Sequence, residues 1–205
     1  MFALRGLPPA MPELHAERVA RNGDVEIVTQ AFGDKRDPAV LLIMGANAPM
    51  TRWPEDFCLR LAAAGRYVIR YDNRDTGQST TFPAGAPGYN VRDLVADAIA
   101  VLNLHRVVKA HVVGMSMGGM IAQHLAILHP SRVASLALAG TTPDPSAVAF
   151  AIGEGADNRA LPMPWQKAID LIGLLACVDW SDRRQAEFAW VLEETVLLGS
   201  GDKPD

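Results

Sequence analysis

The sequence predicts an α/β fold, in which an open and mostly parallel β-sheet carries helices on both faces. Two observations lead to this prediction. Strand-like and helix-like stretches alternate from residue 25 to residue 139. The strand-like stretches are mostly short, uninterrupted apolar runs, which are typical of strands buried on both faces of a parallel sheet. Such alternation places successive strands parallel to one another, joined by right-handed crossovers.

The first half of this pattern contains two strands and one helix. Residues 25–32 are rich in β-forming side chains and end at a Gly-Asp turn. Residues 39–44 form a continuous apolar run, which predicts a buried strand. Residues 54–64 are predicted to be helical, because Pro54 suits a first helical turn and Gly65 suits the residue after a helix end.

The second half contains three strands and two helices. Residues 67–71 are predicted to form a strand that leads into a polar loop. Apolar residues recur at helical spacing over residues 91–102. A short strand over residues 110–113 and a helix over residues 119–128 follow, and the apolar run 133–139 is the last predicted strand.

The composition of the chain changes after this last strand. Residues 144–198 contain two or three helical stretches and no convincing strand, and a polar tail follows them. We therefore predict three parts: an N-terminal extension over residues 1–17, an α/β core over residues 18–143, and a helical cap-like segment with its tail over residues 144–205.

Composition excludes several classes of protein. The 205 residues are 49% apolar and 20% charged, which is enough for a large core and excludes global disorder. A net charge of −4 without a basic run argues against nucleic acid and anionic membranes as partners. Cys58 and Cys177 have no metal-like spacing and form no disulfide framework. We expect a cytoplasmic protein without a signal peptide, membrane span, metal or cofactor.

The motif that carries chemistry is Gly-Met-Ser-Met-Gly over residues 114–118. It follows a predicted strand and opens a predicted helix, which is the context of a nucleophile elbow. In that turn the serine hydroxyl projects above the sheet, and glycines are needed where side chains would collide with the neighbouring strand and helix. The following helix offers N–H groups to a developing oxyanion. The alternative is a chance match in a glycine-containing loop, which the flanking strand and helix disfavour.

These features resemble the α/β-hydrolase superfamily, in particular its esterase, methylesterase and cofactor-free haloperoxidase branch. The resemblance covers residues 18–142 and weakens in the following segment, where the family carries a variable helical cap. The family's later strands, which carry the triad acid and histidine, have no counterpart here. The segments that match family motifs are residues 42–47, 71–79, 111–122 and 129–133.

The resemblance implies roles for particular residues. Ser116 would be the nucleophile, and a serine there, rather than an aspartate, disfavours the haloalkane dehalogenase and epoxide hydrolase branches. The backbone N–H of Met117 would be one oxyanion donor and that of Ala46, within one position, the second. The apolar residues that would either line an acyl or alcohol pocket or simply pack in the core are Met50, Trp53, Met115 and Met117.

The sequence lacks an evident base for Ser116, which a serine nucleophile needs. His124 lies about 12 Å away along the following helix, at a rise of about 1.5 Å per residue. His111 lies about 16 Å back along the strand, at about 3.3 Å per residue. We expect structural roles for both, and likewise for His105 and His129.

The acidic residues give no evident triad member either. Every aspartate and glutamate after Ser116 lies in the cap-like segment, where a solvated charge is the simpler explanation. Asp72 and Asp75 precede the serine, and we expect them to bind backbone N–H groups and Arg74.

Two functions therefore remain open. The first is a serine hydrolase that acts on a small-molecule ester, in a truncated or processed chain. The second is an inactive relative that binds a small apolar ligand or a protein. In either case the apolar strand at residues 133–139 would have a bare edge, which invites pairing. We expect a homo-oligomer, a complementing C-terminal fragment or the segment 144–198 to cover it, and a swapped dimer would bring His15 near Ser116.

Overall fold

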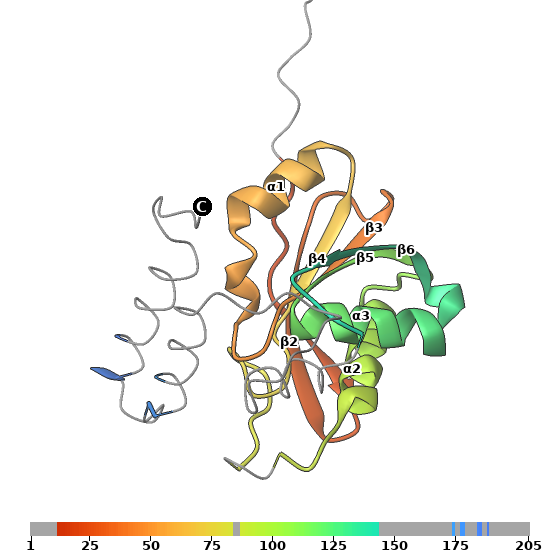
Figure 1. The fold of residues 1–205 in the computed structure, drawn as a ribbon. Helices are drawn as coiled ribbons and strands as arrows, with labels where there is room; N and C mark the ends of the chain where they lie inside the picture. The colour runs from red at the N-terminus through yellow and green to blue at the C-terminus, as the bar shows by residue number, and fades with distance from the viewer. Residues whose placement is uncertain are drawn as a thin grey trace, which may run out of the picture. The chain divides into compact units, whose positions relative to one another are not determined.

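A computed structural model describes residues 12–83 and 87–143, together with positions 174, 177, 178, 184, 185 and 188. The chain divides into two compact units, Met1–Pro143 and Asp144–Asp205. The first unit contains the α/β core (Figure 1). The helices and the polar tail expected after residue 143 lie outside the described residues, apart from those six positions.

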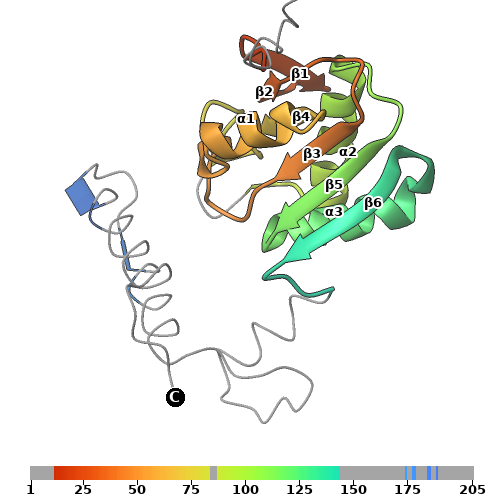
Figure 2. The same ribbon diagram turned by 90° about the horizontal axis from the view of Figure 1, so that it is seen from above.

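The core is one six-stranded sheet in the order β1-β2-β4-β3-β5-β6 (Figure 2). β3 pairs in parallel with β4 and with β5, and β5 pairs in parallel with β6, whereas β1 and β2 add an antiparallel edge. The predicted mostly parallel sheet is therefore confirmed. The strands are β1 Arg18–Asn22, β2 Val25–Phe32, β3 Ala39–Ile43, β4 Tyr67–Tyr71, β5 Ala110–Met115 and β6 Val133–Ala139.

Helices cover both faces of the sheet, as the sequence predicts. α1 packs on one face through Cys58 and Ala62, while α2 and α3 share the core of the other face. Alternate residues of β3 face the two sides, so Leu41 belongs to the core under α2 and α3 and Leu42 to the core under α1. The helices are α1 Glu55–Ala63, α2 Val91–Leu104 and α3 Met117–Leu128, with short 3₁₀ turns η1 Met50–Arg52 and η2 Pro130–Arg132.

The sequence pattern does not reveal β1. Three of its five residues are charged or polar, and only Ala20 is buried. An edge strand that is buried on one side only lacks the apolar run by which the inner strands are found. β1 is instead fixed by its full antiparallel register with β2, from Arg18 opposite Thr29 to Asn22 opposite Val25.

β6 forms the other edge of the sheet. It pairs with β5 on one side, and within the described part of the chain no strand pairs with its other side. Six of its seven residues are exposed, among them Leu136 and Leu138.

No helix within the described residues is long and apolar enough to cross a membrane.

Candidate active site

Ser116 occupies the turn between β5 and α3. The strand runs to Met115, two residues beyond the predicted end at residue 113, and the helix begins at Met117, two residues before its predicted start. Ser116 itself has φ 51° and ψ −120° and is exposed. A non-glycine residue at positive φ costs about 1–3 kcal/mol and persists only where its surroundings enforce it. Its N–H donates to the Ala139 carbonyl of β6 at 2.9 Å, which fixes the turn.

Two glycines make this turn possible. A Cβ on Gly114 would lie 2.6 Å from the carbonyl carbon of Gly118 and from the Cα of Gly119. A Cβ on Gly118 would lie 2.6 Å from the carbonyl carbon of Ile43. Both clashes are with backbone, which cannot rotate away. The spacing Gly-x-Ser-x-Gly is therefore a steric requirement of the way α3 approaches β3 and β5.

The loop after β3 lies directly against the serine. A Cβ on Gly45 would stand 3.1 Å from the Cβ of Ser116 and 3.7 Å from its Oγ. Ala46 is the next residue and is exposed, and Asn47 after it has φ 56°. The backbone of this loop and the first turn of α3 thus meet beside the Ser116 hydroxyl, as an oxyanion hole requires.

Two consecutive residues after β4 hold this loop in place. Asn73 Nδ2 donates to the Met44 carbonyl at 3.0 Å, immediately before Gly45. Asp72 Oδ1 accepts from the Met50 N–H at 2.6 Å, at the far end of the loop, and its Oδ2 accepts from the Gln78 N–H at 2.9 Å. Both side chains are almost fully buried. The expectation that Asp72 binds backbone N–H groups agrees with these bonds, whereas the role of Asn73 was missed.

The structure corrects the partner expected for Arg74. Its partner is neither Asp72 nor Asp75 but Asp97 of α2, which it binds with two bonds of 2.5 and 2.8 Å. Asp72 is already engaged by backbone N–H groups, and Asp75 accepts from the Tyr89 hydroxyl and a backbone N–H. The hydrogen bonds that Arg74 donates to Asp97 raise the pKa of Arg74. This buried pair joins the loop after β4 to α2.

The apolar residues proposed from the sequence lie in different surroundings. Met50 and Trp53 are 2% and 8% exposed, and Trp53 stacks on Phe57 at 5.8 Å between ring centroids. Met115 is 36% exposed at the end of β5, and Met117 is partly buried against the core under α2 and α3. Met115 and Met117 therefore flank Ser116, whereas Met50 and Trp53 follow the loop that touches it.

None of the five histidines, all of which lie among the described residues, forms a hydrogen bond with Ser116. Four of them are bonded elsewhere, which agrees with the structural roles expected for three of these four, His105, His111 and His124. The bonds are His15 with the Gly33 carbonyl, His105 with Tyr67 and Thr29, His111 with Ser135, and His124 with the Met120 carbonyl. Within the described residues no group of three or more histidine, cysteine or acidic side chains is arranged to hold a metal.

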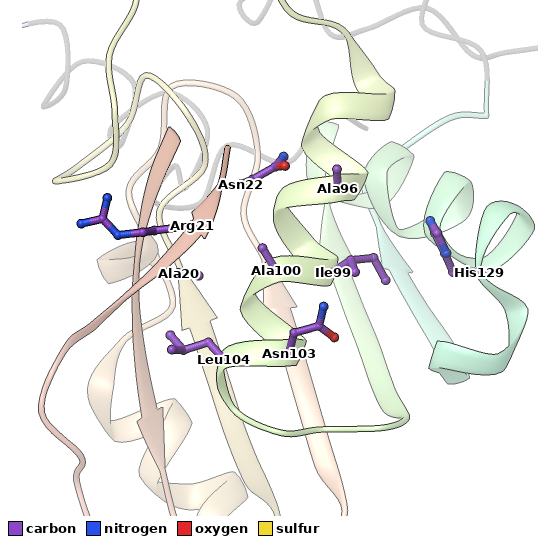
Figure 3. Close-up of a pocket in the computed structure, with 9 residues that line it drawn as sticks. All are labelled: Ala20, Arg21, Asn22, Ala96, Ile99, Ala100, Asn103, Leu104 and His129. Carbon is purple, nitrogen blue, oxygen red and sulfur yellow. The ribbon is translucent and has the colours of Figure 1, made fainter. Parts of the chain in front are cut away.

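A separate hollow of about 500 Å³ lies between β1, α2 and the end of α3 (Figure 3). Arg21 and Asn22 of β1 line one side and His129 the other, with a row of α2 side chains between them. No residue of the elbow or of the loop after β3 lines it. This hollow is therefore not the site of chemistry at Ser116.

Ser116 at positive φ and the two glycines beside it form a tight strand-turn-helix elbow at the end of β5. The family model of the alpha/beta hydrolase fold matches residues 38–175, which is more than half of the chain. The chain therefore belongs to the α/β-hydrolase fold family.

Curated relatives agree with this assignment. The chain is 40% identical over 163 residues to rhodomycin D methylesterase DnrP of Streptomyces peucetius, covering 77% of this chain and 54% of that protein. It is 34% identical over 119 residues to the putative carbamate hydrolase RutD of Variovorax paradoxus (strain S110), covering 58% and 43%. The chain spans about half the length of these relatives.

A solved structure supports the fold. The 2-hydroxy-6-oxo-6-phenylhexa-2,4-dienoate hydrolase BphD from Rhodococcus sp. strain RHA1 superposes with a TM-score of 0.60, at 24% identity, covering 94% of this chain and 68% of that one. At this identity the likeness concerns the architecture alone.

Proposed function

We propose that this protein hydrolyses a small-molecule ester by acyl transfer through Ser116. The observation that carries the proposal is the strained backbone of Ser116 at the elbow, with the Gly45 backbone packed against it. A protein that only binds a ligand gains nothing from a serine held at positive φ, which costs about 1–3 kcal/mol. The same backbone conformation projects the hydroxyl of a nucleophilic serine away from the sheet.

In the proposed reaction Ser116 Oγ attacks the ester carbonyl carbon while its proton passes to a general base. The N–H groups of Met117 and Ala46 hold the negative oxygen of the tetrahedral intermediate, and the amino end of α3 adds a favourable dipole. The C–O bond to the alcohol then breaks, and the alcohol leaves with the proton. Water attacks the acyl-serine and releases the carboxylic acid, which restores Ser116.

We propose that the base comes from outside the described residues, since none of the described histidines is bonded to Ser116. We propose that the histidine and its acid belong to a segment that completes the family fold, in the same polypeptide or in a second chain. The 205-residue chain alone is then expected to show little turnover, since an elbow without its base retains only binding and oxyanion effects.

For the substrate we propose a carboxylic methyl ester. The proposal rests on the 40% identity to a protein named rhodomycin D methylesterase. A methyl ester places a small alcohol on the leaving side and the larger acyl part on the other. The exposed Met115 beside Ser116 is then available to contact the acyl part.

The test compares ester hydrolysis by the complete protein from its native host with that of two variants. Ser116→Ala should abolish release of acid from methyl esters, as followed by titration at constant pH. Ser131→Ala, an exposed serine of η2, is the matched control and should hydrolyse at the unaltered rate. A Ser116→Ala rate equal to that of the unaltered protein would remove Ser116 from the mechanism.

The second candidate function is ligand binding without turnover. The observation in its favour is that none of the described histidines is bonded to Ser116. Under this alternative the complete protein binds a methyl ester in calorimetry but releases no acid, and Ser116→Ala binds equally well. Acid release by the complete protein excludes it.

A further inference from the structure

We propose a second binding site, for a small dianion such as a phosphate group or a dicarboxylate, at the edge of the sheet opposite Ser116. The site is a hollow of about 400 Å³, which is large enough for a small molecule. The residues of its lining that carry the argument are His15, Arg18, Lys35, Tyr67, His105 and Arg106. The proposal does not rest on the proposed ester hydrolysis.

The hollow lies at the amino ends of the parallel strands. Tyr67 is the first residue of β4, Lys35 precedes β3, and Arg106 follows the end of α2. Ser116 follows the last residue of β5, which runs parallel to β3. At about 3.3 Å per residue a five-residue strand separates the two edges by about 16 Å, so the hollow is separate from the nucleophile.

The charge around this hollow is reversed relative to the chain as a whole, whose net charge is −4. Arg18, Lys35 and Arg106 line it, and no aspartate or glutamate does. All three side chains are exposed, and within the described residues none of them has a hydrogen bond or ion pair. Glu13 lies near the hollow, but it faces His15 at 3.4 Å. Three free cations around one concavity favour an anion.

The floor of the hollow is polar, neutral and fully bonded. Thr29 Oγ1 donates to the Arg70 carbonyl, so it accepts from His105 Nε2 at 3.2 Å. His105 Nδ1 then accepts the Tyr67 hydroxyl proton at 2.7 Å. Burial, together with smaller contributions from the charges of Arg18, Lys35 and His15, lowers the pKa of His105 to about 4.

This arrangement selects the ligand class. The floor has no acidic side chain that could bind a cation, and its hydroxyl and imidazole groups are already hydrogen-bonded to one another. The groups left to bind a ligand are the three cationic side chains at the rim. Guanidinium forks of Arg18 and Arg106 match the paired oxygens of a phosphate or carboxylate, and the Lys35 ammonium adds a point charge. A hollow of about 400 Å³ suits a small molecule better than an extended polyanion.

The test titrates the protein with inorganic phosphate, with succinate and with sodium chloride at matched ionic strength. Amide resonances of residues 15–18, 35 and 105–106 report the site. We expect the shifts of these resonances to saturate with phosphate or succinate, and we expect no saturable shift with chloride. The probe with the lower dissociation constant shows whether the site prefers a phosphate or a dicarboxylate. Equal shifts with all three salts would overturn the proposal.

Charge-matched variants separate a site from general electrostatics. Arg18→Gln/Arg106→Gln should weaken binding of the dianion at least tenfold. Arg60→Gln/Arg92→Gln removes the same charge from exposed positions of α1 and α2 and should bind within twofold of the unaltered protein. Equal weakening in both variants contradicts a defined site. Ser116→Ala should bind the dianion as the unaltered protein does, which keeps this result independent of the proposed hydrolysis.

Discussion

Asn73 is the residue whose contribution to the candidate active site is easiest to isolate. Its amide donates to the Met44 carbonyl, next to the glycine that touches Ser116. Replacing it with alanine leaves that buried carbonyl without a donor, which costs about 1–3 kcal/mol of stability. The freed peptide before Gly45 also loses its fixed orientation.

We therefore predict that Asn73→Ala lowers kcat of ester hydrolysis at least tenfold while KM changes little, because an oxyanion donor acts mainly in the transition state. Asn103→Ala, an exposed position that accepts a bond from Arg132, is the control and should leave both constants unchanged. Unaltered kcat in Asn73→Ala would mean that this bond does not position the loop. Steady-state kinetics on the complete protein make the comparison.

The buried His105 makes the stability of the folded protein depend on pH. Burial keeps it neutral and lowers its pKa from 6.5 to about 4 in the folded state. The unfolded chain therefore binds more protons between these two values, so stability is complete above pH 6.5 and falls as pH decreases toward 4. At 1.36 kcal/mol per pKa unit the loss amounts to about 3 kcal/mol.

Urea unfolding at a series of pH values measures this loss. His105→Gln should flatten the pH dependence between pH 6.5 and 4, at the cost of a lower stability at pH 7. His111→Gln, at a less buried position on β5, serves as the matched control and should retain the slope. An unchanged slope in His105→Gln would assign the acid sensitivity to other groups.

Arg74 and Asp97 show how one contact joins two elements. The side chains are 6% and 1% exposed, and Asn22 of β1 also donates to Asp97. Removing one partner of a buried ion pair leaves an uncompensated charge and costs about 3–5 kcal/mol.

We predict that Asp97→Ala lowers the free energy of unfolding by about 3 kcal/mol or more. Asp34→Ala, which breaks the exposed pair with Arg36, should change it far less, because solvent screens an exposed ion pair. Arg74→Met/Asp97→Leu should recover most of the loss, because no charge is then left buried. Chemical denaturation that finds equal effects of the two single changes would contradict the structural role of the buried pair.

The elements also show what the sequence predicts and where it fails. Inner strands such as β3 follow from their apolar runs, and the elbow follows from its Gly-x-Ser-x-Gly spacing between a predicted strand and a predicted helix. Gly114 avoids backbone within the same turn, whereas Gly118 avoids the backbone of β3. β1 and the Arg74–Asp97 pair depend on contacts between distant segments. For Arg74 the neighbouring aspartates are the nearer partners in sequence, yet the structure selects an acid 23 residues away.

The same limit applies to the site. The bond from Asn73 to Met44 exists because β3 and β4 are parallel neighbours, although 29 residues separate the two positions. Sequence patterns place Ser116 at the turn, but they do not show which residues fix the loop that faces it.

At the scale of the whole molecule the exposed edge of β6 is the unusual feature. Strand edges that present unpaired backbone groups and apolar side chains promote association. We propose that a second copy or a complementing segment covers this edge. Sedimentation of the 205-residue chain at micromolar concentration should therefore detect species heavier than 22.0 kDa.

Leu138→Lys places a charge on this edge and should shift the chain toward the monomer. Val108→Lys changes an exposed apolar residue outside the strands, 81% exposed, and should not. A stable species of 22.0 kDa in the unaltered chain, with the edge of β6 exposed to solvent, would refute the assembly prediction.

Hydrolysis by acyl transfer requires that Ser116 carries the acyl group during turnover. Mass spectrometry of the complete protein, quenched in acid during turnover of a nitrophenyl acetate ester, tests it most directly. We predict an added acetyl mass on the peptide that contains Ser116, and its absence in Ser116→Ala. Turnover without any acyl adduct, or with the adduct on another residue, would contradict acyl transfer through Ser116.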